Sequence, residues 1–183
     1  MALLTEAEKK HQRHYQGKLL SMISKMINPE RILEIGTFTG YATLCLAEGL
    51  RENGRIYTID INLELEDMVR SNFKRSDLDS KIIYQIGDAK EIIPTLNETF
   101  DLVFIDADKK NNATYYDMIM DKVRSGGLIL VDNVLWSGKV LDEDVSDQKT
   151  SFISRFNKIV SSDQRVEKLI LPVRDGLFLI RKK

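Results

Sequence analysis

Three residues with oxygen-bearing side chains end two short apolar segments and could together bind a divalent cation. Asp106 ends the segment 101–106, while Asp132 ends the segment 128–132 and is followed by Asn133. If these segments are neighbouring parallel strands, the three side chains meet at one edge of the sheet. Carboxylate and amide oxygens suit Mg²⁺, Mn²⁺ or Ca²⁺ and do not favour zinc. Strand-end aspartates also commonly cap helices or bind loop amides, and the spacing alone leaves both interpretations open.

A lysine follows the first of these acidic residues and could act on a proton near a bound cation. Lys109 lies three positions after Asp106. A lysine beside a divalent cation loses its proton more readily, because like charges disfavour the protonated form. A neutral lysine can act as a general base. The alternative is a solvated surface lysine next to Lys110.

A glycine-containing loop follows the apolar segment 31–36 and suits a ligand that carries an amino group. Residues 34–40 read E-x-G-x-x-x-G, which differs from the G-x-G-x-x-G of dinucleotide-binding proteins. Glycines at such a turn let the backbone approach a ligand. The ammonium of an amino-acid ligand could bind Glu34 or a nearby carbonyl, whereas a pyrophosphate needs free helix N–H groups. A turn that binds no ligand is the alternative.

Two further apolar segments end in residues that suit a nucleoside. Asp60 ends the segment 55–60 and could accept both hydroxyls of a ribose. The small residues Gly87 and Ala89 flank Asp88 and would let an adenine ring lie against the backbone. Asp60 and Asp88 could instead cap the helices that follow them.

The alternation of apolar and amphipathic segments predicts a doubly wound α/β fold. Seven short segments have the composition of strands: 31–36, 55–60, 81–87, 101–106, 128–132, 166–171 and 177–182. Amphipathic segments predict helices over 6–27, 39–51, 63–76, 89–96 and 111–123. The connection 172–176 is too short for a parallel crossover. We therefore expect a Rossmann-like, seven-stranded, mostly parallel sheet with one antiparallel strand near its edge.

Composition predicts one ordinary soluble domain. The 183 residues are 43% hydrophobic and 30% charged, without a linker-like stretch, so we expect a single domain over 1–183. A net charge of −1 without a basic stripe argues against a nucleic-acid partner. One cysteine, Cys45, excludes an intrachain disulfide. Because no apolar run could span a bilayer and residues 1–15 lack the apolar core of a signal peptide, we expect a cytoplasmic protein without a membrane partner.

The order and spacing of four motifs resemble the cation-dependent O-methyltransferases, which include the catechol and caffeoyl-CoA enzymes. The motifs are LEIGTFTGYATL (33–44), FIDADK (104–109), VDNVLWSGKV (131–140) and LPVRDGL (171–177). The resemblance implies a class I methyltransferase fold, S-adenosylmethionine (SAM) as methyl donor and a bound divalent cation. It also implies a small hydroxylated aromatic acceptor, catechol-like or of the hydroxycinnamoyl type, and a homodimer.

The resemblance further implies roles for individual residues. Its metal ligands correspond to Asp106, Asp132 and Asn133, and its catalytic base, acting beside Asp106, corresponds to Lys109. SAM contacts are implied at Glu34, Gly36, Thr37, Gly40, Ala42, Asp60, Ala89 and Asp106, with Asp60 on the ribose. Trp136 and Ser137 would line the acceptor site, although ordinary packing is an equal alternative for Trp136.

The sequence departs from the family pattern in three places. Ala42 replaces a serine that contacts the methionine carboxylate, which removes a hydrogen bond worth about 0.5–1.5 kcal/mol. Ser137 replaces an asparagine that contacts the substrate of the plant enzymes. The helical segment 1–28 is shorter than its counterpart in the family, where additional helices help to close the acceptor site and pack the dimer.

Two competing functions remain at this point. A nicotinamide-dependent dehydrogenase would have a similar sheet, but the glycine loop and the acidic strand ends argue against it. A SAM-binding protein without catalytic activity would not need both Lys109 and the three oxygen ligands. Among the remaining residues, His11 and His14 are expected on a solvated face, Cys45 in the core, and Tyr115 and Tyr116 packed on the sheet. The acidic stretch 142–144 is expected to form a solvated loop over the site.

Overall fold

Seven strands form one sheet in the computed structural model, which describes residues 6–141 and 147–183. They are β1 (Arg31–Ile35), β2 (Arg55–Asp60), β3 (Ile82–Ile86), β4 (Phe100–Ile105), β5 (Val123–Asp132), β6 (Val166–Leu171) and β7 (Leu177–Lys182), in the order β3-β2-β1-β4-β5-β7-β6. Strands β1 to β5 pair in parallel, and β7 runs antiparallel to both β5 and β6. The expected mostly parallel sheet with one reversed strand near its edge is confirmed.

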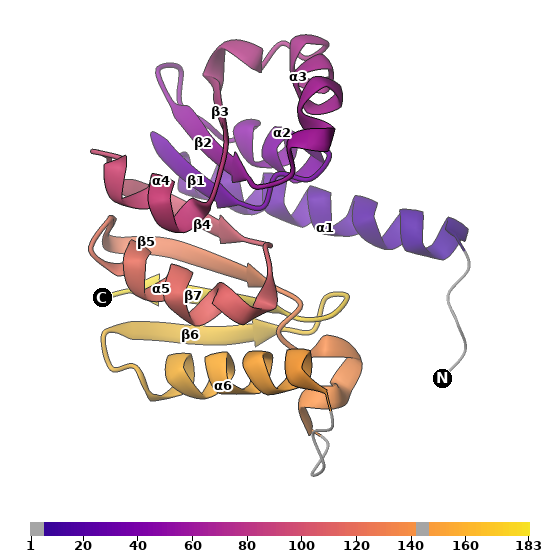
Figure 1. The fold of residues 1–183 in the computed structure, drawn as a ribbon. Helices are drawn as coiled ribbons and strands as arrows, with labels where there is room; N and C mark the ends of the chain where they lie inside the picture. The colour runs from indigo at the N-terminus through magenta and orange to yellow at the C-terminus, as the bar shows by residue number, and fades with distance from the viewer. Residues whose placement is uncertain (1–5, 142–146) are drawn as a thin grey trace.

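Helices cover both faces of the sheet (Figure 1). They are α1 (Glu6–Ile27), α2 (Tyr41–Ala47), α3 (Glu66–Lys74), α4 (Ala89–Thr95), α5 (Asn112–Met120) and α6 (Gln148–Ser162). One apolar cluster contains Leu20 of α1 and Leu46 of α2, and another contains Ile119 of α5 and Phe156 of α6. The central strands are therefore buried on both faces, which explains why they read as nearly continuous apolar runs. Within the described ranges, no helix has both the length and the apolar character that a membrane span requires.

The region between β4 and β6 differs most from the sequence-based expectation. Helix α6 is absent from that prediction, although Asp147 caps it by accepting a hydrogen bond from the N–H of Thr150 at 2.8 Å. The acidic stretch 142–144, expected to be a solvated loop, lies outside the described residues. Strand β5 begins at Val123, where the prediction still has helix, because the polar and glycine-rich residues 124–127 hide the first half of the strand.

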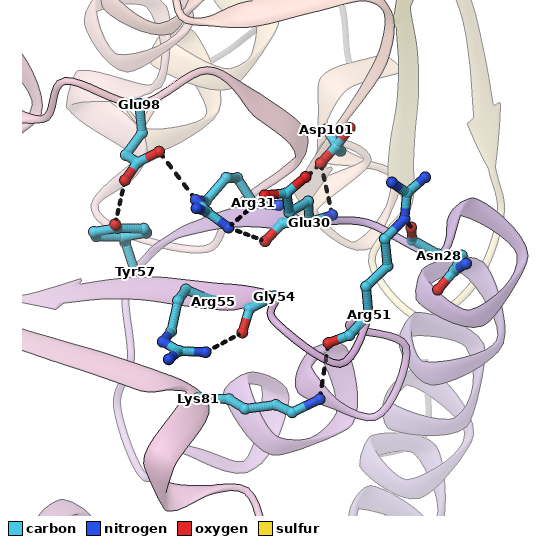
Figure 2. Close-up of polar contacts among 10 residues, drawn as sticks. All are labelled: Asn28, Glu30, Arg31, Arg51, Gly54, Arg55, Tyr57, Lys81, Glu98 and Asp101. Carbon is cyan, nitrogen blue, oxygen red and sulfur yellow. Dashed lines mark hydrogen bonds and ion pairs between the residues drawn. The ribbon is translucent and has the colours of Figure 1, made fainter.

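A group of charged side chains joins the strand ends opposite the carboxyl edge of the sheet (Figure 2). Asp101 Oδ2 accepts hydrogen bonds from the backbone N–H groups of Glu30 and Arg31, at 2.8 and 2.9 Å. Arg124 Nε donates to Asp101 Oδ1 at 2.7 Å, and Arg31 Nε donates to Glu98 Oε2 at 3.0 Å. These contacts fix the starts of β1, β4 and β5 relative to one another.

Replacing Asp101 with asparagine should destabilise the protein by about 1–3 kcal/mol at neutral pH, because charged hydrogen bonds are lost. Burial acts to raise the pKa of Asp101, but the hydrogen bonds from Arg124, Arg31 and Glu30 outweigh it and lower that pKa. A carboxyl group whose pKa is lowered on folding stabilises the protein above its unfolded pKa and loses that effect as pH falls below about 4. The stability difference between Asp101→Asn and wild type should therefore shrink between pH 7 and pH 3 in urea denaturation.

The control for this experiment is Glu167→Gln, which removes an exposed ion pair with Arg181. That change should alter the free energy of unfolding by less than about 0.5 kcal/mol. A difference for Asp101→Asn that stays constant down to pH 3 would contradict the stabilising role of the Asp101 charge.

Candidate functional site

The loop after β1 lies directly against the end of β4, and one glycine permits this contact. Gly36 has φ +100°, and a Cβ atom added to it would lie 2.3 Å from the carbonyl oxygen of Asp106. Its N–H donates to Ile59 O at 2.8 Å, while the N–H of Asp106 donates to Ile35 O at 2.9 Å. Only glycine fits this conformation and this spacing. The carboxyl ends of β1, β2 and β4 therefore meet at this loop.

Two cavities in the described part of the structure are lined by residues of this contact. The first has a volume of about 640 Å³ and is lined by four residues that the sequence predicts to contact SAM: Gly36, Asp60, Ala89 and Asp106. The second has a volume of about 540 Å³ and is lined by another overlapping set of four such residues: Gly36, Thr37, Ala42 and Asp106. Gly36, Phe38 and Asp106 line both, so one elongated ligand could occupy the two cavities together.

Backbone hydrogen bonds fix the carboxylate of Asp60 at the first cavity. Its Oδ2 accepts from the N–H of Phe38 at 2.6 Å, and its Oδ1 accepts from the N–H of Asn62 at 2.9 Å. The helical turn that follows is capped by Asn62, whose side chain accepts from the N–H of Glu64, and not by Asp60. Each carboxylate oxygen has a second lone pair, so Asp60 can still accept the hydroxyls of a ribose.

The residues after β3 form another wall of the first cavity. Asp88 caps α4 by accepting from the N–H of Lys90 at 2.8 Å, so the capping role that the sequence allows for it is confirmed. Ala89 is buried beside it and also lines the cavity. Tyr115 also lines this cavity and donates to Asp108 Oδ1 at 2.8 Å, and it is buried in the apolar cluster between α5 and the sheet, as expected.

Glu34 is fully buried beneath the glycine loop. Its Oε2 accepts hydrogen bonds from the hydroxyls of Thr43 and Thr58, and the structure shows no partner for its Oε1. Burial, opposed by the two threonine hydrogen bonds, raises the pKa of Glu34 to about 8. Among the described residues, Glu34 is not one of those that line either of these cavities. Its contact with an ammonium group stays a prediction.

The two acidic strand ends lie side by side. Strands β4 and β5 are parallel neighbours, and Ile105 pairs with Val131, so Asp106 and Asp132 follow at equivalent positions. Asp132 is 1% exposed, and burial, followed by the charge of Asp106, raises its pKa. The next residue, Asn133, has φ +62° and donates its N–H to Asp132 Oδ1 at 2.8 Å.

Lys109 belongs to this group and is not a solvated surface lysine. Its Nζ lies 2.9 Å from Asp106 Oδ1, and its side chain is 10% exposed. In the described part of the chain, no cluster of three or more His, Cys, Asp or Glu residues could hold a metal ion. A metal site at these strand ends would therefore depend on the amide oxygen of Asn133 in addition to the two carboxylates.

Sequence reasoning missed two polar residues that contact Asp132. Arg174, in the β6–β7 connection, has its Nη1 atom 3.7 Å from Asp132 Oδ2 and donates to Gln16 Oε1. Gln16, on α1, also forms a side-chain hydrogen bond with Asp132 that acts to lower the pKa of that carboxyl group. Arg174 lies in the motif 171–177, whereas Gln16 lies outside the four motifs, and the contact between these two residues joins parts of the chain 158 residues apart.

The remaining predicted residues lie near the site without lining either cavity. Ser137 donates from its N–H and its hydroxyl to Asp175 Oδ1, at 3.2 and 3.1 Å, so the loop after β5 is tied to the β6–β7 connection. Trp136 is partly buried in the same loop, with φ +48°. Gly40, with φ +79°, begins α2 and packs against the ring of Phe73.

Replacing Glu34 with glutamine should change how the stability of the protein depends on pH. Because the folded-state pKa of Glu34 lies above its unfolded value, the wild type loses stability as pH rises from about 4.5 towards 8. Glutamine has no proton to lose, so Glu34→Gln should lose less stability over this range, by an amount on the order of a few kcal/mol. Chemical denaturation at pH 5 and pH 8 measures this difference, and parallel pH profiles for the two proteins would show that Glu34 is not perturbed.

Comparison with known proteins supports a common origin for this arrangement. The profile of a family described as O-methyltransferase matches residues 5–183. Caffeoyl-CoA O-methyltransferase 2 from Populus trichocarpa is 35% identical over 179 residues, covering 91% of this chain and 72% of the plant protein. Caffeoyl-CoA O-methyltransferase 2 from Petunia hybrida is 36% identical over 179 residues, and the match covers 91% of this chain and 74% of the Petunia protein.

Solved structures show the same fold. An O-methyltransferase from Bacillus cereus, in complex with SAH, has a TM-score of 0.87 and 33% identity, over 92% of this chain and 81% of that one. The O-methyltransferase TomG from Streptomyces achromogenes, involved in tomaymycin synthesis and solved with SAM, has a TM-score of 0.86 and 28% identity. That match covers 100% of this chain and 92% of TomG.

Proposed function

The chain belongs to the O-methyltransferase family, and from this premise we propose that it transfers the methyl group of SAM to a hydroxyl group of a catechol-like or hydroxycinnamoyl-type aromatic compound. We also propose that the reaction needs a divalent cation, with Mg²⁺ as the first candidate. The observation that carries the proposal is the pair of adjacent strand-end carboxylates, Asp106 and Asp132, beside cavities that suit a nucleoside with a charged tail.

The first cavity suits the adenosine part of SAM. Asp60 would accept the ribose hydroxyls, and Ala89 leaves room for the adenine ring against the backbone. Gly36 lines both cavities, so the ligand would pass this residue where the cavities join. Because Gly36 has no side chain, the loop here can also pack directly against the end of β4. The sulfonium would then lie near Asp106, which lines both cavities.

The donors at the ends of β4 and β5 fit a divalent cation. Asp106, Asp132 and Asn133 would hold it through oxygen atoms alone, as Mg²⁺ prefers. Asp106 contributes to the raised pKa of Asp132, which is the repulsion that a cation between them would relieve. Such an ion would make a hydroxyl group of the acceptor more acidic and therefore a better nucleophile.

Lys109 would take the proton of the acceptor hydroxyl. Its contact with Asp106 holds the amine at the end of β4, beside one of the proposed metal ligands. The hydroxyl oxygen would form a bond to the methyl carbon as the carbon–sulfur bond breaks, which would give a methyl ether and S-adenosylhomocysteine (SAH). The main contribution of the protein is to hold oxygen, carbon and sulfur in line.

The acceptor would lie against the loop after β5. Trp136 supplies an apolar surface there, and Ser137 supplies a polar one that is anchored to Asp175. The expected homodimer and the expected cytoplasmic location stay predictions.

Two variants should separate the metal site from the SAM site. Asp132→Asn removes a charge from the proposed metal site, so Mg²⁺-dependent formation of SAH should fall by at least about a hundredfold while the affinity for SAM stays within about threefold of wild type. Asp60→Ala removes the ribose acceptor, so the affinity for SAM should fall by about ten- to a hundredfold while Mn²⁺ binding is unchanged. A screen of vicinal diols, with and without Mg²⁺, supplies the acceptor, and calorimetry measures both affinities.

Treatment with EDTA completes this experiment. Methylation that continues at full rate in EDTA would contradict the role of the metal without affecting the SAM site. A protein that binds SAM but forms no SAH with any diol would instead be a SAM-binding protein without catalytic activity.

A further inference from the structure

The β6–β7 connection places an arginine in the second cavity at a position that favours glycine. Arg174 has φ +52°, a left-handed conformation that non-glycine residues rarely adopt. Its side chain lines the second cavity and is 26% exposed. Strained residues of this kind persist where the surrounding structure fixes them, and they cluster at ligand sites. The strained backbone at Arg174 therefore makes its guanidinium a candidate for binding a ligand.

The part of SAM that would occupy the second cavity depends on which part occupies the first. If adenosine fills the cavity at Asp60, the amino-acid tail of SAM extends past Gly36 into the second cavity, because Gly36 and Asp106 line both. The tail carries a carboxylate that needs donors when it leaves water. Ala42, on the wall of this cavity, offers only a methyl group. Among the described residues that line the second cavity, Arg174 is the one lysine or arginine.

We propose that Arg174 binds the carboxylate of the methionine tail of SAM and is a cofactor-binding residue of this enzyme. The proposal rests on the proposed function, since it requires SAM to span both cavities. Arginine suits this role because its planar guanidinium can donate two parallel hydrogen bonds to one carboxylate.

The contacts that Arg174 already makes leave part of its guanidinium available to bind a carboxylate. In the part of the chain that the structure describes, its contacts with Gln16 Oε1 and Asp132 Oδ2 both use the same atom, Nη1. The donors on Nε and Nη2 remain for a ligand. Gln16 is buried, lines the same cavity and contacts both Arg174 and Asp132, so it helps to position the guanidinium.

The alternative is that Arg174 only neutralises the buried charge of Asp132. Both roles predict some loss of stability when the arginine is removed, so stability alone does not separate them. They differ for ligands with and without the carboxylate, because an arginine that serves only Asp132 should affect both kinds of ligand equally.

The test compares SAH with 5′-methylthioadenosine, which keeps the adenosine and lacks the amino-acid tail. In calorimetry with EDTA present, Arg174→Gly should weaken SAH binding by about ten- to a hundredfold and leave methylthioadenosine within about twofold of wild type. Glycine accepts φ +52°, so this variant should fold. Arg174→Lys, which keeps the charge without the planar fork, should give an intermediate loss for SAH.

A second pair of ligands identifies the carboxylate as the group that Arg174 binds. Decarboxylated SAM keeps the ammonium and the sulfonium, so Arg174→Gly should weaken SAM binding and leave the binding of decarboxylated SAM unchanged or stronger. The matched control is Arg181→Gln, which removes an exposed arginine outside both cavities and should bind all four ligands like the wild type.

Three outcomes would overturn the proposal. Equal losses for ligands with and without the carboxylate, in both Arg174 variants, would assign Arg174 to Asp132 alone and leave the SAM site intact. Unchanged SAH binding by Arg174→Gly would do the same. A wild-type protein that binds neither SAH nor methylthioadenosine would refute the proposed SAM site itself and, with it, the role of Arg174.

Discussion

The parallel pairing of β4 with β5 is the constraint on which the proposed chemistry depends. It brings Asp106 and Asp132 to equivalent positions on adjacent strands, where two carboxylates repel each other unless a positive charge lies near them. The structure supplies such charges from Lys109, three residues after Asp106, and from Arg174, in the β6–β7 connection, which lies near Asp132. A divalent cation would meet the same requirement more completely. The backbone topology therefore creates a repulsion between two carboxylates that positive charge at the site must balance.

The buried carboxyl groups at the carboxyl edge of the sheet reduce the stability of the fold, and contacts elsewhere in the structure offset this loss. Glu34 and Asp132 are both buried carboxyl groups with raised pKa values, and neither would be expected in a core chosen for stability alone. At the opposite edge, Asp101 has a lowered pKa, because its hydrogen bonds favour the charged form. Stabilising ion pairs therefore lie at the starts of the strands, while the buried carboxyl groups at their carboxyl ends reduce the stability of the fold.

Much of this arrangement is readable from the sequence, because short apolar segments ending in polar residues indicate both the strands and the edge where ligands bind. The alternation of segments predicts the sheet, and the short connection 172–176 predicts the reversed strand. Helix α6 is not predicted, since the acidic stretch before it reads as loop and its cap, Asp147, lies within that polar run. The first half of β5 is hidden because residues 124–127 lack apolar side chains.

The candidate site is predictable where it follows strand ends and unpredictable where it depends on long-range contacts. Asp60, Asp106 and Asp132 are found from position alone. Gln16 and Arg174 are not, because their proximity to Asp132 depends on how α1 and the β6–β7 connection pack around the sheet. The burial of Glu34 away from both cavities likewise depends on the packing of two threonines from other elements.

The most direct measurement of the central claim is an anomalous difference map from crystals grown with Mn²⁺ and SAH. The account predicts one strong peak within about 2.5 Å of oxygen atoms from Asp106, Asp132 and Asn133 together. A map without a peak at these strand ends, collected from crystals in which SAH is bound, would contradict the claim that β4 and β5 build a cation site.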